Sequence, residues 1–308
     1  ASNLLRMERV LTLWLAPTTQ IVEQTLRALR DKAHAYRRAL DDAFGGCVSV
    51  MDLKSALSLQ RGALEADTVV IVSTMAALRV ENTDGRKIYE DNGVLMSNFD
   101  ALTQEQEKVL HNGDGGIVRS LANLLRIRRP IVVVDEAHNA RTSLSFESLA
   151  RFNPSCILEF SATPSQSAER DNEPSNVLTH VSAAQLKTDE MIKLPILLTT
   201  KAQWVEAVQE ALNKQSQLEK LALEEQANTG QYIRPIVLFQ AQHNVTGANH
   251  VTFDILKKAL VEEFHVAEGQ IAVSTGNEKG LEGVDLLRED EKIRYVITVD
   301  RLREGWDC

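Results

Sequence analysis

Several features that mark other classes of protein are missing from this sequence. Its only cysteines are Cys47, Cys156 and Cys308, which are widely spaced and form no C-x-x-C pair. This usage argues against a disulfide framework or a zinc site and indicates a reducing cytoplasm. No apolar run approaches the roughly 18 residues that a membrane span requires, and the N-terminus lacks the layout of a cleavable signal. We therefore expect a cytoplasmic protein with no membrane partner.

The chain also lacks the excess of positive charge that nucleic-acid-binding proteins usually carry. Its 34 Lys and Arg residues are outnumbered by 43 Asp and Glu residues, which gives a formal net charge of −9. This balance does not indicate nucleic-acid binding, although a local groove can be positive on an acidic body. Composition alone leaves the partner undecided.

A further absence concerns the phosphate-binding loop G-x-x-x-x-G-K-[ST], whose amides and lysine cradle the phosphates of a nucleotide. The sequence contains no match, because the glycine clusters at 45–46 and 113–116 lack the lysine. The chain also begins at Ala1 rather than at a methionine and stops at Cys308, soon after a predicted strand. We therefore expect these residues to be a segment of a longer protein.

What the sequence does contain is a series of short apolar runs, most of them followed by a polar or helix-like stretch. Continuous β-branched runs are typical of strands covered on both faces, as in a parallel sheet. The predicted strands are residues 10–16, 68–73, 131–135, 156–161, 235–240, 270–274 and 295–300. Helical patterns lie between them, at 18–44, at 203–227 and in a stretch that Pro130 stops. This alternation predicts an α/β doubly wound architecture.

The organisation changes near MIKLP, at residues 191–195. A proline there follows a stretch without strong periodicity, and a long charged helix then begins. We place a domain boundary at about residue 193. This gives two α/β units, 1–192 and 193–308, of which we expect the second to be incomplete.

The clearest chemical signal is IVVVDEAHNA, residues 131–140, in which two adjacent carboxylates follow a fully apolar strand. Functional groups gather at the carboxyl ends of parallel strands, where loops open a crevice. Asp135 can hold a Mg²⁺ ion there, together with substrate phosphates. Glu136 can orient or deprotonate a water for attack on a γ-phosphate, and His138 can hydrogen-bond toward a neighbouring strand end. The ordinary alternative is an acidic strand end with solvated charges.

A second signal, FSATPS at residues 160–165, follows the next predicted strand. In helicase-like motors a Ser-Ala-Thr triplet lies beside the DEAH strand, where its hydroxyls can bond to the loop that carries the acids and the histidine. Ser161 and Thr163 would be those hydroxyls here; otherwise they only cap the backbone at a strand end. The two motifs one strand apart are harder to explain by chance than either motif alone.

Residues 135–164, DEAHNARTSLSFESLARFNPSCILEFSATP, and the terminal VDRLREGWDC resemble the superfamily 2 helicase-like motor of type III restriction enzyme Res subunits. The resemblance covers essentially the whole chain. It implies two RecA-like domains with mainly parallel sheets, which bind ATP and Mg²⁺ in their cleft and grip DNA across their upper surface. It also implies a modification (methyltransferase) subunit as a partner. The family's phosphate loop would precede Ala1, and its arginine-bearing element would follow Cys308.

In the first domain, the resemblance assigns two elements to DNA contact. LAPTTQ, residues 15–20, matches the first of them, with Thr18 and Thr19 as donors to backbone phosphates. VSTMAAL, residues 72–78, matches the second, with Ser73 and Thr74 as candidates. The alternative role of these hydroxyls is to cap the helices that follow.

In the second domain, the resemblance adds residues from two further stretches. VSTGNEKG, residues 273–280, places Thr275 and Gly276 where backbone amides can meet a phosphate. VDRLREGWD matches the element that couples nucleotide to nucleic acid. There Gly305 permits close approach, Asp307 faces the nucleotide cleft, and Asp300 would lie in the loop between the two ligands.

These patterns favour an ATP-dependent DNA translocase, the motor segment of a type III restriction subunit. Two alternatives stay open. The motor could belong to another superfamily 2 helicase that acts on DNA or RNA. The isolated segment could also be a catalytically inactive nucleic-acid-binding module, because it lacks the phosphate loop.

Overall fold

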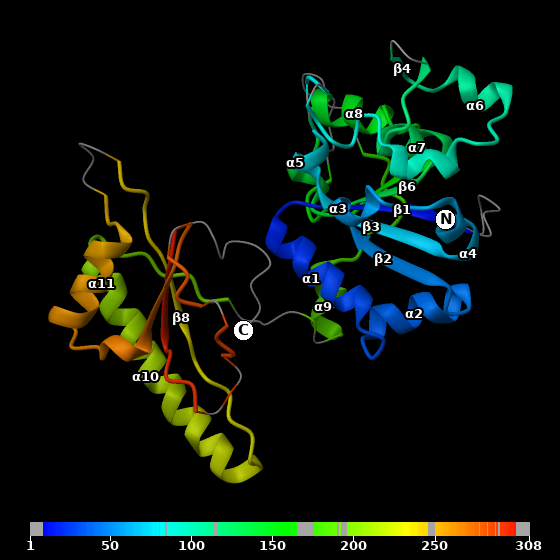
Figure 1. Cartoon of the computed structure of the whole chain (residues 1–308). Coiled ribbons are helices and arrows are strands. Elements are labelled where there is room, and N and C mark those ends of the chain that lie inside the picture. Colours follow the sequence, from blue (N-terminus) through cyan, green and yellow to red (C-terminus); the bar gives the residue numbers. More distant parts are fainter. Residues whose placement is uncertain are drawn as a thin grey trace. The chain divides into compact units, whose positions relative to one another are not determined.

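The computed structural model of the chain divides it into two compact units, Ala1–His180 and Val181–Cys308, and the predicted boundary near residue 193 falls within the second of them. Helices and strands alternate in both units (Figure 1). The residues that the structure describes are 9–79, 81–83, 85–113, 116–164, 175–189, 191, 196–245, 250–276, 278–281, 283–286, 288 and 290–299.

The first unit is built on a five-stranded parallel sheet with the strand order β2-β3-β1-β6-β7. Its strands are β1 (Leu11–Ala16), β2 (Val48–Asp52), β3 (Thr68–Thr74), β6 (Ile131–Val134) and β7 (Cys156–Glu159). Leu15 of β1 pairs with Ser73 of β3 on one side and with Val134 of β6 on the other. The carboxyl ends of the three central strands therefore lie at the same edge of the sheet.

Helices cover both faces of this sheet, with α1 and α2 on one side and α7 and α8 on the other (Figure 1). On the first face, Leu26 and Leu29 of α1 pack with Val70 and Val72 of β3. On the second face, the larger core joins alternate residues of β1, β3 and β6 to the helices. The helices are α1 (Thr19–Arg30), α2 (Ala35–Phe44), α3 (Leu53–Ala56), α4 (Arg61–Ala66), α7 (Leu121–Arg128) and α8 (Ser143–Ala150).

The helical pattern predicted over residues 18–44 forms two helices rather than one. Asp31 leaves the helical conformation with ψ 109°, and its side chain accepts a hydrogen bond from the Ala33 amide at 2.9 Å. His34 then caps α2. Short polar side chains compete with the helix for backbone donors in this way.

The segment between β3 and β6 forms a small lobe on the second face. It contains α5 (Met75–Leu78), the 3-10 helix η1 (Gly93–Asn98), α6 (Gln104–Lys108) and the two-residue strands β4 (Asn112–Gly113) and β5 (Gly116–Ile117). The buried Asn123 side chain bonds to the backbone of His111 and Val118 and so fixes the base of this hairpin to α7. As predicted, α7 stops before Pro130.

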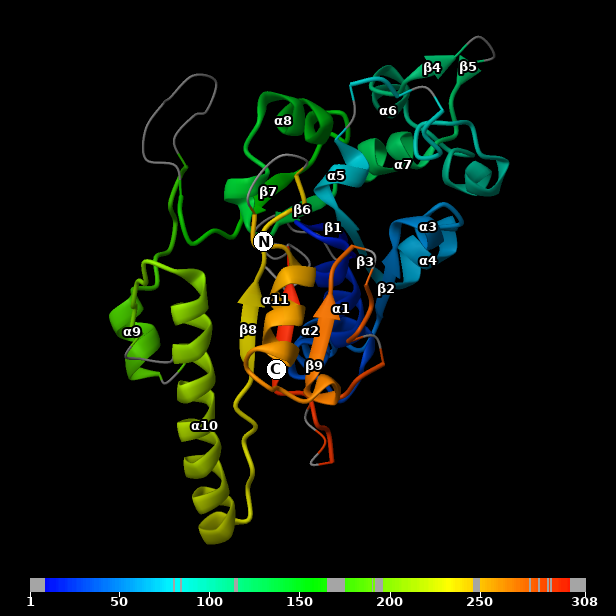
Figure 2. The same ribbon diagram turned by 90° about the vertical axis from the view of Figure 1, so that its left-hand side faces the viewer.

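The second unit has a three-stranded parallel sheet with the order β8-β10-β9. Val208 of the long helix α10 and Leu260 of α11 pack on one face with Ile297, while Leu281 and Val284 lie with Val296 in a separate cluster. Helix α10 runs alongside β8 (Figure 2). The elements of the second unit are α9 (Ala183–Thr188), α10 (Trp204–Thr229), β8 (Val237–Gln240), α11 (Phe253–Glu262), η3 (Glu268–Gln270), β9 (Ile271–Ser274) and β10 (Tyr295–Thr298).

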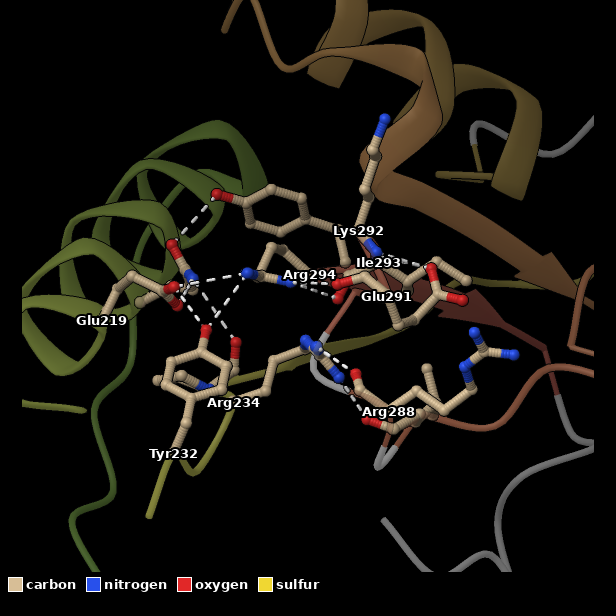
Figure 3. Close-up of polar contacts among 12 residues, drawn as sticks. Glu219, Tyr232, Arg234, Arg288, Glu291, Lys292, Ile293 and Arg294 are labelled. Carbon is tan, nitrogen blue, oxygen red and sulfur yellow. Dashed lines mark hydrogen bonds and ion pairs between the residues drawn. The ribbon is translucent and has the colours of Figure 1, made fainter. Parts of the chain in front are cut away.

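A polar network fastens α10 to the start of β10 (Figure 3). The Tyr232 hydroxyl donates to Glu219 Oε1 at 2.5 Å, and Arg294 donates to the same oxygen at 3.3 Å. The Tyr295 hydroxyl donates to Gln215 at 3.3 Å. Burial raises the pKa of Tyr232, and the hydrogen bond to Glu219 raises it further. The network therefore favours the neutral form of Tyr232, which donates its hydroxyl proton to Glu219.

The predicted α/β class with parallel sheets is confirmed, and the structure is consistent with a RecA-like fold. Each of the seven predicted strands is present, and their ends differ from the prediction by at most two residues. Strand β2, which the sequence pattern did not reveal, is added to the sheet. None of the helices in the described part of the chain is long and apolar enough to cross a membrane.

Candidate functional site

Strand β6 delivers Asp135 and Glu136 to the carboxyl edge of the first sheet. The Asp135 amide still belongs to the sheet ladder, because it donates to the Leu15 carbonyl of β1 at 2.8 Å. Glu136 then turns into the left-handed conformation, with φ 48° and ψ 50°, and its amide donates to Asp135 Oδ1 at 3.1 Å. This conformation costs a non-glycine residue about 1–2 kcal/mol, and such strain gathers at functional sites.

His138 joins the acids to the next strand of the sheet. It lies in the short 3-10 helix η2 (Ala137–Asn139), and its Nδ1 is 3.3 Å from Glu136 Oε2 and 3.4 Å from Ser161 Oγ. Ser161 Oγ also accepts the Thr163 amide at 3.2 Å. The structure thus places Glu136, His138, Ser161 and Thr163 together where β6 and β7 end. Their catalytic and coupling roles stay predictions.

Two further contacts hold these loops together. The Ala137 amide donates to the Phe160 carbonyl at 2.9 Å. Arg141 forms a two-point ion pair with Glu159, in which Nη2 lies 3.2 Å from Oε2 and Nε lies 3.2 Å from Oε1. Paired contacts of this geometry are stronger than single ones. Arg141 was not predicted from the sequence. A usable signal was present, because Arg141 follows Asp135 by six residues and the oppositely charged Glu159 ends the next strand.

A pocket of about 90 Å³ opens beside the acids, at the carboxyl ends of β1, β3 and β6. This is where ligands bind in open α/β sheets. The described lining of this pocket combines the two carboxylates with one cation, Arg79, which the sequence analysis also missed. Its lining residues are Ala16, Pro17, Met75, Ala76, Arg79, Asp135, Glu136 and Ala140.

The residues predicted to contact nucleic acid in the first unit lie at the same edge. Thr18 caps α1 by accepting the Ile21 amide at 3.3 Å, and Thr74 caps α5 by accepting the Ala77 amide at 3.2 Å. Thr19 is exposed at the start of α1, whereas Ser73 is buried and donates to the Thr74 carbonyl at 3.3 Å. A hydroxyl that accepts in a cap keeps its own proton for donation. Capping and phosphate contact are therefore compatible for Thr18 and Thr74.

In the second unit, Thr275 is engaged within its own loop. Its amide donates to the Glu278 carbonyl at 2.9 Å, and its hydroxyl oxygen accepts the Glu278 amide at 3.0 Å. The loop returns so closely to β9 that a Cβ atom at Gly280 would lie 2.6 Å from the Val273 carbonyl oxygen, so only glycine fits there. A phosphate contact at Thr275 or Gly276 stays a prediction. Asp300, Gly305 and Asp307 lie outside the described residues.

The acid pair suits Mg²⁺ better than it suits a metal ion whose ligands all come from the protein. Within the part of the chain that the structure describes, no group of three or more His, Cys, Asp or Glu side chains could hold a metal ion. Mg²⁺ differs from zinc in that it is often held by one or two carboxylates, with waters and substrate phosphates as its other ligands. Asp135 and Glu136 beside an open pocket supply that kind of donor set.

Adjacent acids at the end of one parallel strand, tied through a histidine to a Ser-Ala-Thr turn at the end of the next, define a helicase-like motor domain. The family model described as type III restriction enzyme, res subunit, matches residues 2–166, more than half of the chain, and the chain belongs to this family. The predicted resemblance is thereby confirmed over residues 2–166, and its extension to the end of the chain stays a prediction. No curated protein matches the sequence.

Proposed function

We propose that this chain is the motor segment of an ATP-dependent DNA translocase of the type III restriction kind. The observation that carries the proposal is the contact of Glu136 with His138 and of His138 with Ser161, beside a pocket at the carboxyl edge of the sheet. Family membership makes the chain part of a helicase-like, nucleotide-hydrolysing superfamily. The DNA substrate and the translocation activity are the proposed part.

In this proposal the two acids have separate tasks. Asp135, which the sheet ladder holds in place, would hold the metal ion. When bound, Mg²⁺ neutralises charge on the nucleotide phosphates. Glu136 orients the attacking water and accepts its proton, and its left-handed backbone and the His138 contact hold the carboxylate in position. His138 and Ser161 connect that carboxylate to the end of β7, and Thr163 supports Ser161.

DNA would approach the ends of β1 and β3, where Thr18, Thr19 and Thr74 present hydroxyls and Ser73 supports the loop. Contacts of this type position a nucleic acid without reading its sequence. The second unit would contribute Thr275, Gly276, Asp300, Gly305 and Asp307 to the nucleotide and DNA contacts. Closing and opening of the two domains would then couple hydrolysis to movement, and a modification subunit is the expected protein partner.

The direct test is replacement of Glu136 by Gln in the full-length protein, with DNA-stimulated ATP hydrolysis as the readout. We expect turnover to fall by about 10²–10⁴-fold, because the proton acceptor is lost, while nucleotide binding is kept. Glu90→Gln, at an exposed position away from the pocket, is the matched control and should leave turnover unchanged. Normal hydrolysis in the Glu136→Gln protein would remove the base assignment.

A non-catalytic nucleic-acid-binding module is the second candidate for these 308 residues. It is favoured by one observation, the absence of a G-x-x-x-x-G-K-[ST] loop from the sequence. Without the amides and the lysine of that loop, little remains to hold the β- and γ-phosphates.

A further inference from the structure

Among the residues that the structure describes, Arg79 is the one cationic residue that lines the pocket beside Asp135 and Glu136. It follows α5 directly, and its backbone amide donates to the Met75 carbonyl at 2.9 Å as the helix ends. The side chain is exposed. Among the described residues, Arg79 has no ion-pair partner within 4 Å, so neither acid neutralises its charge.

The chain next to the pocket also contains the start of a helix. Ala16 and Pro17 lead into the first turn of α1, and the start of a helix carries a partial positive charge together with backbone amides that have no partner in the helix. The hydroxyls of Thr18 and Thr74 cap the two helices that begin here. The pocket lining therefore combines two carboxylates with a guanidinium, and two helix starts capped by hydroxyls follow its lining residues or precede them in the chain.

The size of the pocket suits a group larger than water. At about 90 Å³, it exceeds the roughly 10–15 Å³ that a single water requires on this measure. A phosphodiester group placed in it would be repelled by Asp135 and Glu136 and drawn to Arg79. A guanidinium matches the oxygens of a phosphate with paired hydrogen bonds.

We propose that Arg79 binds a backbone phosphate of the nucleic acid at the pocket that it shares with Asp135 and Glu136. This inference rests on the proposed function and adds a binding residue to it. Arg79 contacts the nucleic acid and not the reacting atoms. Because the acids line the same pocket, a phosphate held by Arg79 changes the electrostatic surroundings of Glu136. The pocket is thus a direct physical link between nucleic-acid binding and the acid pair.

The test measures binding of a fluorescent DNA duplex to the 308-residue chain by anisotropy, without nucleotide, from about 50 to 200 mM salt. We compare the unaltered chain with Arg79→Ala and Arg79→Lys. The matched control is Arg38→Ala, at an exposed position on α2, which packs on the face of the sheet away from α5. Thermal melting checks that each protein is folded, and exposed substitutions should shift Tm by no more than about 2 °C.

We expect Arg79→Ala to weaken binding about tenfold, the effect of one charged hydrogen-bonding contact. It should also reduce the slope of log affinity against log salt by about one. Arg79→Lys should keep the slope and lose only part of the affinity, because the charge remains and the paired geometry does not. Arg38→Ala should match the unaltered chain.

Other outcomes separate this inference from the function beneath it. If the unaltered chain binds DNA and Arg79→Ala binds as well as Arg38→Ala, Arg79 is not a DNA contact, and the proposed function stands. If Arg79→Ala keeps DNA affinity and loses affinity for pyrophosphate, the residue serves a nucleotide phosphate instead, and the inference is overturned. If the unaltered chain does not bind DNA at all, the proposed DNA-translocating function fails with it.

Discussion

The fold opposes the protonation of His111, which precedes the β4–β5 hairpin. Partial desolvation lowers the pKa of the largely exposed imidazole, and the nearby cations Arg126 and Arg151 lower it further. Arg126 Nη1 lies 3.3 Å from His111 Nε2, and this contact suits a neutral ring that accepts from the guanidinium. In the unfolded chain the pKa returns to about 6.5. The unfolded state therefore takes up the proton first as the pH falls.

A prediction at the residue scale follows from that difference. The folded pKa is depressed, so the stability that His111 contributes is complete above about pH 6.5 and is lost as the pH falls toward the folded value. His111→Gln removes the titration, and Tm should then decline less steeply between about pH 7 and pH 5. His180→Gln, at an exposed position, should leave the original slope. Parallel Tm curves for His111→Gln and the unaltered chain would show that His111 does not carry the effect.

Residue identity alone located part of the candidate site. Asp135, Glu136, His138 and Ser161 stand in two short motifs at the ends of predicted strands, so pairing of the two strands was enough to bring them together. Arg79 could not be found in this way. It follows a four-residue helix and belongs to no recognised pattern, and its place in the pocket depends on how the loops after β1, β3 and β6 meet.

At the scale of elements, α10 is held to its sheet by a narrow contact. The helix is 26 residues long, yet the buried residues along it are Val208, Gln215 and Ala222, which recur every seven positions. Gln215 is 7% exposed and donates to Glu219 and to the Pro235 carbonyl while it accepts from Tyr295. Polar contacts therefore supplement a limited apolar interface in the middle of the helix (Figure 3).

We expect Tyr232→Phe to destabilise the second unit by about 1–3 kcal/mol, because it leaves partly buried polar groups without their partner. The lost hydroxyl donates to Glu219 at 2.5 Å and accepts from Arg294 at 3.1 Å. The measurement is urea unfolding followed by a probe in this unit. Tyr36→Phe is the control, since Tyr36 is 67% exposed, and its effect should stay within about 0.5 kcal/mol. Equal unfolding curves for the two variants would assign the network no role in stability.

The elements themselves were largely predictable. Apolar runs such as TVVIVS and IVVV are buried on both faces, so the local sequence of each run is enough to predict a strand. Strand β2, VSVMD, contains Ser49 and Asp52 and is half-buried beyond its first residue. It forms because β3 offers it a partner from Thr68 to Val72. That stabilisation comes from tertiary pairing and leaves little trace in the local sequence.

For the whole molecule, family membership indicates nucleotide hydrolysis, whereas the missing phosphate loop indicates weak nucleotide binding. The family match covers residues 2–166 and places the chain among helicase-like, nucleotide-hydrolysing proteins. The 308 residues nevertheless contain no G-x-x-x-x-G-K-[ST] sequence. The family match and the missing loop are compatible if Asp135 and Glu136 contact a nucleotide only when a phosphate-binding loop holds it beside them.

We therefore expect the 308-residue chain to bind Mg-ATP more weakly than about 1 mM, a free energy near −4 kcal/mol. Isothermal titration with ATP measures this, with a parallel titration in excess EDTA to isolate the part that depends on Mg²⁺. Asp135 and Glu136 can attract the metal, but within the described part of the chain Arg79 is the only cation that lines the pocket beside them. One guanidinium replaces neither the backbone amides nor the lysine of a phosphate loop. Affinity tighter than millimolar that disappears in EDTA would mean that the pocket holds the phosphates by itself, and the chain would then be a nucleotide-binding unit in its own right.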